Sequence, residues 1–305
     1  MAEHFVQPPH WEVWITLYFF LAGIAGGSYT LGTMLRLWGS QRDEATARIA
    51  FMWSFPIVVV CGILLTIDLG KPLRFWHMMV NTTPGSLGLN FKPWSPISLG
   101  TWALLIFSLF AFVSFLEVMT KRGNDRNVSG TMIVWNIVGS LVALFLASYT
   151  GVVLSVSNQP VWSDSYAIGG LFVASALSAS AAFLAFMSRF RSDDAIPTEA
   201  RLEAADAWFV LLELIMIIAF FVTLSGAGEL WRETATPWLI GWILIFASFI
   251  PSLRRLAGGG RVRYTASGGA VAATRVLAGT GTSAIIVIVG VLILRFVVIY
   301  SAQFQ

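Results

Sequence analysis

Five polar side chains have the types and spacing to hydrogen-bond a carbonyl group and to exchange protons with it. A carboxyl at Asp68 is followed closely by a guanidinium at Arg74 and an imidazole at His77, and phenols stand at Tyr18 and Tyr149. A tyrosine hydroxyl donates hydrogen bonds, a carboxylate accepts protons, and an imidazole does either near neutral pH. Whether these groups can meet depends on the elements that carry them.

The composition places those elements in a membrane. Hydrophobic residues make up 57% of the 305 residues, and charged residues make up only 11%. A soluble domain carries about 25% charged residues, so this protein cannot cover itself with a water-facing surface. The aromatic content of 14% suits a protein that crosses the membrane many times and is anchored at both interfaces.

Eight apolar stretches are long enough to cross a bilayer, which takes about 20 residues in a helix. They cover residues 12–38, 48–69, 96–118, 131–155, 166–190, 206–226, 236–253 and 274–300. The predicted fold is an all-α integral membrane protein with eight transmembrane helices, in one polytopic domain over residues 1–305. Eight helices suggest two four-helix bundles, over 12–155 and 166–300, although no internal repeat marks the division.

Basic residues predict how the protein is oriented. Fourteen of the 19 lysines and arginines follow spans one, three, five and seven. The other five are Lys71, Arg74, Lys92, Arg232 and Arg295, the last of them near the outer end of the final span. Lysine and arginine concentrate in cytoplasmic loops. We therefore expect both termini to lie outside the cytoplasm, on the same side as the loops at 70–95, 156–165 and 227–235.

This orientation brings the candidate groups to one depth. Tyr18 lies a turn or two below the outer surface, Asp68 ends the second span, and Tyr149 lies about 27 Å along the fourth at 1.5 Å per residue. The loop that carries Arg74 and His77 lies beside them. An apolar surround suits a lipophilic ligand that enters from the bilayer.

Each of these residues also has a plainer interpretation. Tyr18 and Tyr149 could belong to the belt of aromatic residues at the membrane interface. Arg74 could anchor the protein at the same interface, and His77 could be a solvated loop residue. Asp68 is harder to explain in this way, because burying a carboxyl in a membrane is costly. Asp68 lies at the negative end of its helix dipole and is expected to be partly buried, and both conditions favour the protonated carboxyl. The positive charge of Lys71 or Arg74 would oppose this effect.

Two further carboxyls lie in the sixth span. Asp206 and Glu213 are one helical repeat apart on the same face. Their spacing could form part of a proton path from the cytoplasm, or either could pair with an arginine and serve only packing.

The sequence excludes several cofactors. Cys61 is the only cysteine, so this protein alone cannot hold a cysteine-ligated iron–sulfur cluster. The three histidines, His4, His10 and His77, lie outside the spans and cannot build a bis-histidine haem site within the membrane. There is no Walker loop, dinucleotide fingerprint, HExxH or CxxC. We therefore expect no metal site, whereas an organic redox partner is compatible with the sequence.

Four motifs follow one another along the first four spans. They are Trp11 to Tyr29 (WEVWITLYFFLAGIAGGSY), Asp68 to His77 (DLGKPLRFWH), Ser95 to Trp102 (SPISLGTW), and Ser148 to Leu154 (SYTGVVL) with PVW at 160–162. Together they resemble the NrfD/PsrC family of polysulfide reductase-like membrane subunits, whose eight helices and outward termini agree with the predicted topology. The last four spans match only in general character.

The resemblance implies a quinone-reactive subunit of a respiratory oxidoreductase complex in a bacterial or archaeal cytoplasmic membrane. By motif position, Tyr149 would hydrogen-bond a quinone oxygen of menaquinone or ubiquinone. Asp68, where relatives often have Glu, would handle a proton, and Arg74 and His77 would line the site or its entrance. Tyr18 stands where some relatives have histidine, which puts a first-helix proton donor in doubt, although a tyrosine can still donate a hydrogen bond.

The resemblance also implies partners, because the protein would pass its electrons on. Relatives work with a ferredoxin-like [4Fe–4S] subunit, which usually serves a molybdopterin catalytic subunit that sets the terminal substrate. Trp94, Trp162 and Trp231 in the external loops could dock such a partner or anchor the interface. The alternative function is a secondary transporter or proton-conducting module, which Pro56 and the carboxyls within the membrane would also suit.

Overall fold

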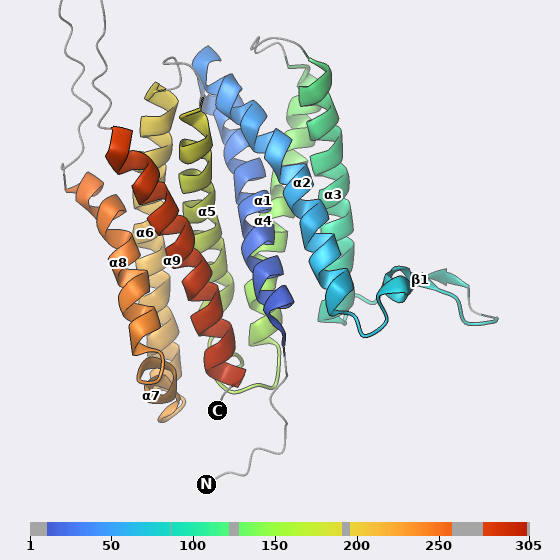
Figure 1. The fold of residues 1–305 in the computed structure, drawn as a ribbon. Coiled ribbons are helices and arrows are strands. Elements are labelled where there is room, and N and C mark those ends of the chain that lie inside the picture. Colours follow the sequence, from blue (N-terminus) through green and yellow to red (C-terminus); the bar gives the residue numbers. More distant parts are fainter. Residues whose placement is uncertain (1–10, 86, 122–127, 191–195, 258–276, 304–305) are drawn as a thin grey trace, which may run out of the picture.

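The chain forms an antiparallel array of long helices (Figure 1). Within residues 11–85, 87–121, 128–190, 196–257 and 277–303, which the computed structural model describes, eight helices are long and apolar enough to cross a membrane. They are α1 (Val13–Trp38), α2 (Glu44–Asp68), α3 (Pro96–Thr120), α4 (Gly130–Ser155), α5 (Ala167–Ser188), α6 (Ile196–Ser225), α8 (Leu239–Leu256) and α9 (Leu277–Gln303). The predicted all-α membrane fold with eight spans is thereby confirmed.

The described residues also contain short helices and strands. They are the 3₁₀ helices η1 (Gln41–Asp43) and η2 (Pro72–Met78), the helix α7 (Leu230–Ala235), and the strands β1 (Val80–Asn81) and β2 (Gly88–Leu89). The strands pair antiparallel, with Val80 opposite Leu89. Of the sequence's histidines, His4 and His10 lie outside the described residues.

Local signals set where helices begin and end. The Ser95 hydroxyl accepts a hydrogen bond from the Ser98 amide at 3.4 Å, and Pro96 occupies the first helical position of α3, where no amide is needed. Helix α2 ends at Asp68, because Leu69 adopts an extended conformation just before Gly70 and Pro72. This end agrees with the stop that the sequence predicts.

The sixth helix begins ten residues before its predicted span. Its polar first turns are held by ion pairs: Glu199 with Arg189 at 3.6 Å, and Arg201 with Asp43 at 2.6 Å. An apolar run predicts only the part of a helix that contacts lipid. The first turns of α6 are polar and stabilised by ion pairs, so the helix begins before its apolar run.

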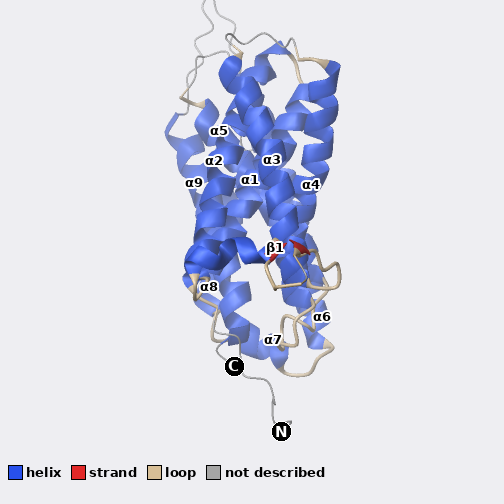
Figure 2. Ribbon diagram, turned by 90° about the vertical axis from the view of Figure 1, so that its right-hand side faces the viewer, coloured by secondary structure: helices blue, strands red, loops and turns tan. Residues whose placement is uncertain are grey.

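Helix α1 lies at the centre of the array and packs against α2, α4 and α5. Small residues allow the close approach that such packing needs. A Cβ atom added at Gly26 would lie 2.8 Å from the Ala143 carbonyl oxygen of α4, and one at Gly27 would lie 2.9 Å from the Ala176 carbonyl oxygen of α5. The two views in Figures 1 and 2 show α1 enclosed by its neighbours.

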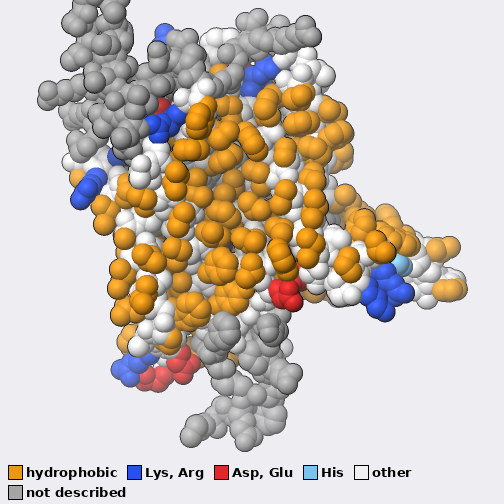
Figure 3. Space-filling view, viewed as in Figure 1, with side chains coloured by type: hydrophobic (Ala, Val, Ile, Leu, Met, Phe, Trp, Pro, Cys, Tyr) orange, Lys and Arg blue, Asp and Glu red, His pale blue; other side chains and the backbone are white. Residues whose placement is uncertain are grey.

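The helices define two ends of the molecule. Val13 and Gln303 lie at one end, which we call the terminal end, and the described parts of the Lys- and Arg-rich connections lie at the other, the basic end (Figure 1). Apolar side chains cover the middle of the face in Figure 3, while charged side chains gather toward the ends. This banding fits a bilayer around the middle of the helices.

Residues 69–85 and 87–95 form an arm that projects sideways near the terminal end and contains η2, β1 and β2 (Figure 1). Asn90 ties the arm to α3, since its carbonyl oxygen accepts hydrogen bonds from the Trp102 indole at 3.2 Å and the Ser98 hydroxyl at 3.3 Å. Its side-chain amide donates to the His77 carbonyl oxygen at 3.1 Å. Through Asn90, these bonds tie η2 to the start of α3.

Candidate functional site

A cavity of about 840 Å³ lies among the terminal-end halves of α1, α2, α3 and α4, with η2 at its mouth. Its wall combines residues from all five elements, and most of them are apolar. The exposed side chains of Ile63 and Ile67 on α2 and of Ile97 on α3 belong to that wall. The cavity therefore reaches the lipid-facing surface between α2 and α3.

Tyr18, Asp68 and Tyr149 all line this cavity. Tyr18 lies five residues after the start of α1, Asp68 is the last residue of α2, and Tyr149 lies six residues before the end of α4. At 1.5 Å per residue, all three lie within about 9 Å of the terminal ends of their helices. The structure thus brings together the three groups that the sequence placed at one depth.

The half-buried Tyr149 forms part of the wall between two cavities. Its hydroxyl donates a hydrogen bond to the Pro96 carbonyl oxygen, and its ring lies over Gly100, where any Cβ atom would overlap it. A second cavity of about 220 Å³, which Trp94 and Phe145 also line, lies on its other side. A hydroxyl with two lone pairs and a rotatable proton can exchange this carbonyl for a ligand oxygen.

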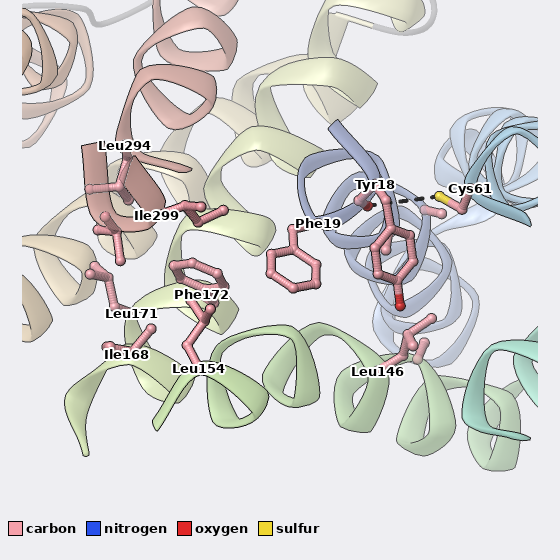
Figure 4. Close-up of a cluster of buried hydrophobic side chains, with 14 of the residues drawn as sticks. Tyr18, Phe19, Cys61, Leu146, Leu154, Ile168, Leu171, Phe172, Leu294 and Ile299 are labelled. Atoms are coloured by element: carbon pink, nitrogen blue, oxygen red, sulfur yellow. Dashed lines mark hydrogen bonds between the residues drawn. The ribbon is translucent and has the colours of Figure 1, made fainter. Parts of the chain in front are cut away.

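Tyr18 is buried at the inner side of the large cavity, with 4% of its surface exposed. Its ring packs against Phe19, and its carbonyl oxygen accepts a weak hydrogen bond from the Cys61 thiol at 3.9 Å (Figure 4). Among the described residues, its hydroxyl has no hydrogen-bond partner. This phenol is available to a ligand in the cavity.

Asp68 lies at the mouth, half-buried, and has no ion pair or hydrogen bond within the described part of the protein. Glu12, at the start of α1, is close enough to act on it electrostatically. Neither Lys71 nor Arg74 pairs with it among the described residues. A carboxyl in this position can exchange protons between the cavity and the aqueous phase at the terminal end.

Arg74 and His77 do not line the cavity wall, but both lie on η2 at its mouth, so their expected place at the site or its entrance stays a prediction. In a 3₁₀ helix, residues three apart share an edge. The edge of η2 that carries Phe75 and Met78 faces the cavity, so Arg74 and His77 lie on another. Arg74 is exposed, and the His77 ring stacks on Trp76 with centroids 3.9 Å apart.

The cavity also includes residues that sequence reasoning did not single out. Trp11 and Phe19 line it from the start of α1, and Phe75, Met78 and Met79 close it from the arm. Trp11 and Phe19 fall within the first motif and the arm residues lie in or just after the second, so motif position was the available signal. Apolar type alone does not separate a cavity wall from a lipid-facing surface.

The sixth-span carboxyls lie elsewhere, among α5, α6, α8 and α9. Asp206 accepts hydrogen bonds from the hydroxyls of Ser178 at 2.7 Å and Ser252 at 2.6 Å. Glu213 is fully buried, and the charged group that acts on it most strongly is the buried Arg295 of α9. Sequence position groups Arg295 with the basic residues of the outer side, but its side chain is buried inside the protein.

The three loop tryptophans differ in their surroundings. Trp94 is 79% exposed and Trp231 is 38% exposed, so both can meet a partner or lipid. Trp162 is buried, and its indole donates to the Val298 carbonyl oxygen at 3.0 Å. Trp162 therefore cannot dock a partner. Its indole instead links the connection between α4 and α5 to α9.

The described residues thus form a polytopic membrane protein with eight membrane-length helices, of which α1 to α4 line a cavity that holds two phenols and a carboxyl and is the candidate ligand site. The family described as "Polysulphide reductase, NrfD" matches residues 3–258. The chain belongs to this family, which confirms the resemblance seen in its motifs. Family membership supports the role of a membrane subunit in an oxidoreductase complex.

Two relatives match nearly the whole chain, and a third matches part of it. Protein NrfD of Escherichia coli is 27% identical over 312 residues, with 96% of this chain and 95% of the relative covered. One polypeptide of the polysulfide reductase of Wolinella succinogenes is 25% identical over 324 residues, with 96% and 94% covered. A subunit of the selenate reductase of Mesobacillus selenatarsenatis is 32% identical over 77 residues, which are 25% of this chain and 18% of that relative.

Proposed function

We propose that this protein is the quinone-reactive membrane subunit of a respiratory oxidoreductase complex. One observation carries the proposal: a single cavity, open toward lipid between α2 and α3, holds Tyr18, Asp68 and Tyr149. A quinone dissolves in the bilayer and must enter from it. Its carbonyl oxygens need hydrogen-bond donors, and its protons need an acceptor near water.

The dimensions and chemistry of the cavity fit a quinone head group. Ligand pockets typically enclose about 300–1,000 Å³ and are mostly apolar with a few polar groups, and this one encloses about 840 Å³. Oxidation of a quinol releases two electrons and two protons. The protein's own part would be to bind and orient the head group through its tyrosines and to move protons through its carboxyl.

The three polar residues would divide this work. The Tyr149 hydroxyl would leave the Pro96 carbonyl and donate to one quinone oxygen, while Tyr18 would donate from the inner wall. Asp68 would take up a proton at the mouth and pass it to water at the terminal end. Arg74 and His77 lie on the arm outside the wall, so we assign them no contact with the head group.

Electrons would leave through a partner at the terminal end. Two relatives are named as parts of a polysulfide reductase and of a selenate reductase, which supports association with reductase subunits. We propose that a ferredoxin-like [4Fe–4S] subunit, followed by a molybdopterin catalytic subunit, docks beside the cavity. The exposed Trp94 and Trp231 lie where such a partner would bind.

The membrane orientation belongs to the same proposal. The excess of Lys and Arg in the connections at the basic end would place that end in the cytoplasm of a bacterium or archaeon. The cavity and the docked partner would then lie at the extracytoplasmic face. The division into two four-helix bundles remains a prediction, with the quinone site in the first.

Removing one hydroxyl tests the site directly. Tyr149→Phe, in the purified protein in nanodiscs, should bind a short-chain ubiquinone or menaquinone analogue about fivefold more weakly, because one hydrogen bond contributes about 1 kcal/mol. Tyr166→Phe is the matched control, since Tyr166 is 86% exposed and should leave binding unchanged. Absence of quinone binding to the unaltered protein, or solute uptake by that protein alone, would contradict the proposal and favour a transporter.

A further inference from the structure

Two buried ionisable groups, one acidic and one basic, lie outside the quinone cavity. Glu213 on α6 and Arg295 on α9 are 0% and 1% exposed. The Arg295 guanidinium donates through Nη2 to the Phe172 carbonyl oxygen at 2.8 Å and lies 3.6 Å from the centre of the Phe172 ring. Its Nε and Nη1 atoms, and both carboxylate oxygens of Glu213, have no hydrogen-bond partner among the described residues.

Packing alone explains this pair poorly. A structural arginine–carboxylate pair gains most from two parallel hydrogen bonds that satisfy both partners, and burying charges without such bonds is costly in a membrane. The Arg36–Glu44 pair of this protein shows that closed arrangement, with the guanidinium Nη2 2.8 Å from Oε1 and Nε 3.3 Å from Oε2 of the carboxylate. Glu213 instead keeps both oxygens free for a proton.

Polar groups lead from the basic end toward Glu213. Arg255, partly exposed at that end, pairs with Glu203 at 3.2 Å and lies 3.9 Å from Asp206. Ser178 and Ser252 both donate to Asp206. Asp206 and Glu213 are seven residues apart on α6, or about 10 Å along its axis.

Aromatic rings lead from Arg295 toward the cavity. The Phe172 ring beneath the guanidinium lies 6.3 Å from the Phe19 ring, measured between centroids. Phe19 lines the cavity beside Tyr18, and Figure 4 shows the three rings following one another across α1. Charges in so apolar a setting are weakly screened. A change of charge in the cavity would therefore act on the pair.

From this placement we infer that Glu213 is a proton-loading site, reached from the basic end through Asp206 and coupled to the redox state of the quinone cavity. The inference rests on the proposed quinone function. One proton from the aqueous phase at the basic end converts the carboxylate to the carboxylic acid, and no other bond changes. The charged groups that act on Glu213 within the described residues are Arg295 and Asp206.

Redox-induced infrared difference spectroscopy can test this inference on the full-length protein loaded with decylubiquinone. We expect a carboxyl C=O band that changes when an electrode reduces the quinone. Glu213→Gln should abolish that band, whereas Glu229→Gln should keep it, because Glu229 is an exposed surface residue paired with Arg232. Quinone bands without any carboxyl band dependent on Glu213 would overturn the inference alone, while the absence of quinone bands would overturn the proposed function as well.

A second variant keeps the test decisive if Glu213→Gln does not fold. Asp206→Asn retains Glu213 but removes a carboxyl on the proposed route. It should preserve the carboxyl band and slow its hydrogen–deuterium exchange at least tenfold. Exchange at the unaltered rate would overturn the route through Asp206.

Discussion

At the scale of single residues, the proposed chemistry depends on the position of each polar group in the cavity. The Tyr149 hydroxyl donates a hydrogen bond to the Pro96 carbonyl oxygen, so it already acts as a donor before a ligand binds. Tyr18 has a hydroxyl without a partner among the described residues, and Asp68 stands at the mouth. The two phenols and the carboxyl thus face one volume from three helices.

Asp68 permits a prediction at this scale. Asp68→Asn keeps the size of the side chain but removes the proton acceptor, and acid–base groups typically contribute about 10²–10⁴-fold to a rate. In the intact complex, quinol-dependent reduction of the partner's clusters should fall by about 10²-fold or more.

The conservative replacement provides the control. Asp68→Glu retains a carboxyl at the mouth, so most of the rate should remain. An unchanged rate in Asp68→Asn would indicate that the residue has no part in proton transfer and that the protein serves as a structural anchor.

At the scale of elements, α1 holds the site together because it contacts α2 and α4 on one side and α5 on the other. Its Gly26 allows the α4 backbone to come close, and its Phe19 links the cavity to Phe172 of α5. The arm acts as a second positioning element, since the register of η2 turns Phe75 and Met78 toward the cavity.

The packing of α1 can be tested with a pair of matched substitutions. Gly26→Ala should lower the free energy of unfolding by about 1–3 kcal/mol, because its methyl group would press on the Ala143 backbone. Gly62→Ala, also inside a helix but with nothing within 4 Å of an added Cβ, should be neutral or slightly stabilising.

Denaturation of both variants in the same detergent measures the difference. Equal stability of the two would show that the contact between α1 and α4 is not tight.

At the scale of the whole molecule, the two candidate sites lie in different parts of the helix array. The proposed quinone cavity lies among α1 to α4 at the terminal end, and Glu213 lies among the later helices on the proposed route from the basic end. Such an arrangement would let chemistry near one membrane face draw a proton from the other.

The orientation of this arrangement can be measured by cysteine labelling. The only native cysteine, Cys61, is buried and should not react. A membrane-impermeant maleimide should label Glu229→Cys, at the terminal end, in intact cells. It should label Thr120→Cys, at the basic end, only after permeabilisation. The reverse pattern would place the basic end outside and contradict the proposed topology.

The sequence by itself determined the eight helices, because each needs only a long apolar run, and its loop charges predict their orientation in the membrane. It also brought Tyr18, Asp68 and Tyr149 to one depth, since distance along a helix follows from residue count. Only the tertiary structure decided which side chains share a cavity. The register of η2, which keeps Arg74 and His77 out of the cavity wall, and the burial of both Glu213 and Arg295 depend on helix rotation and on contacts between distant segments. Periodicity and composition do not encode these.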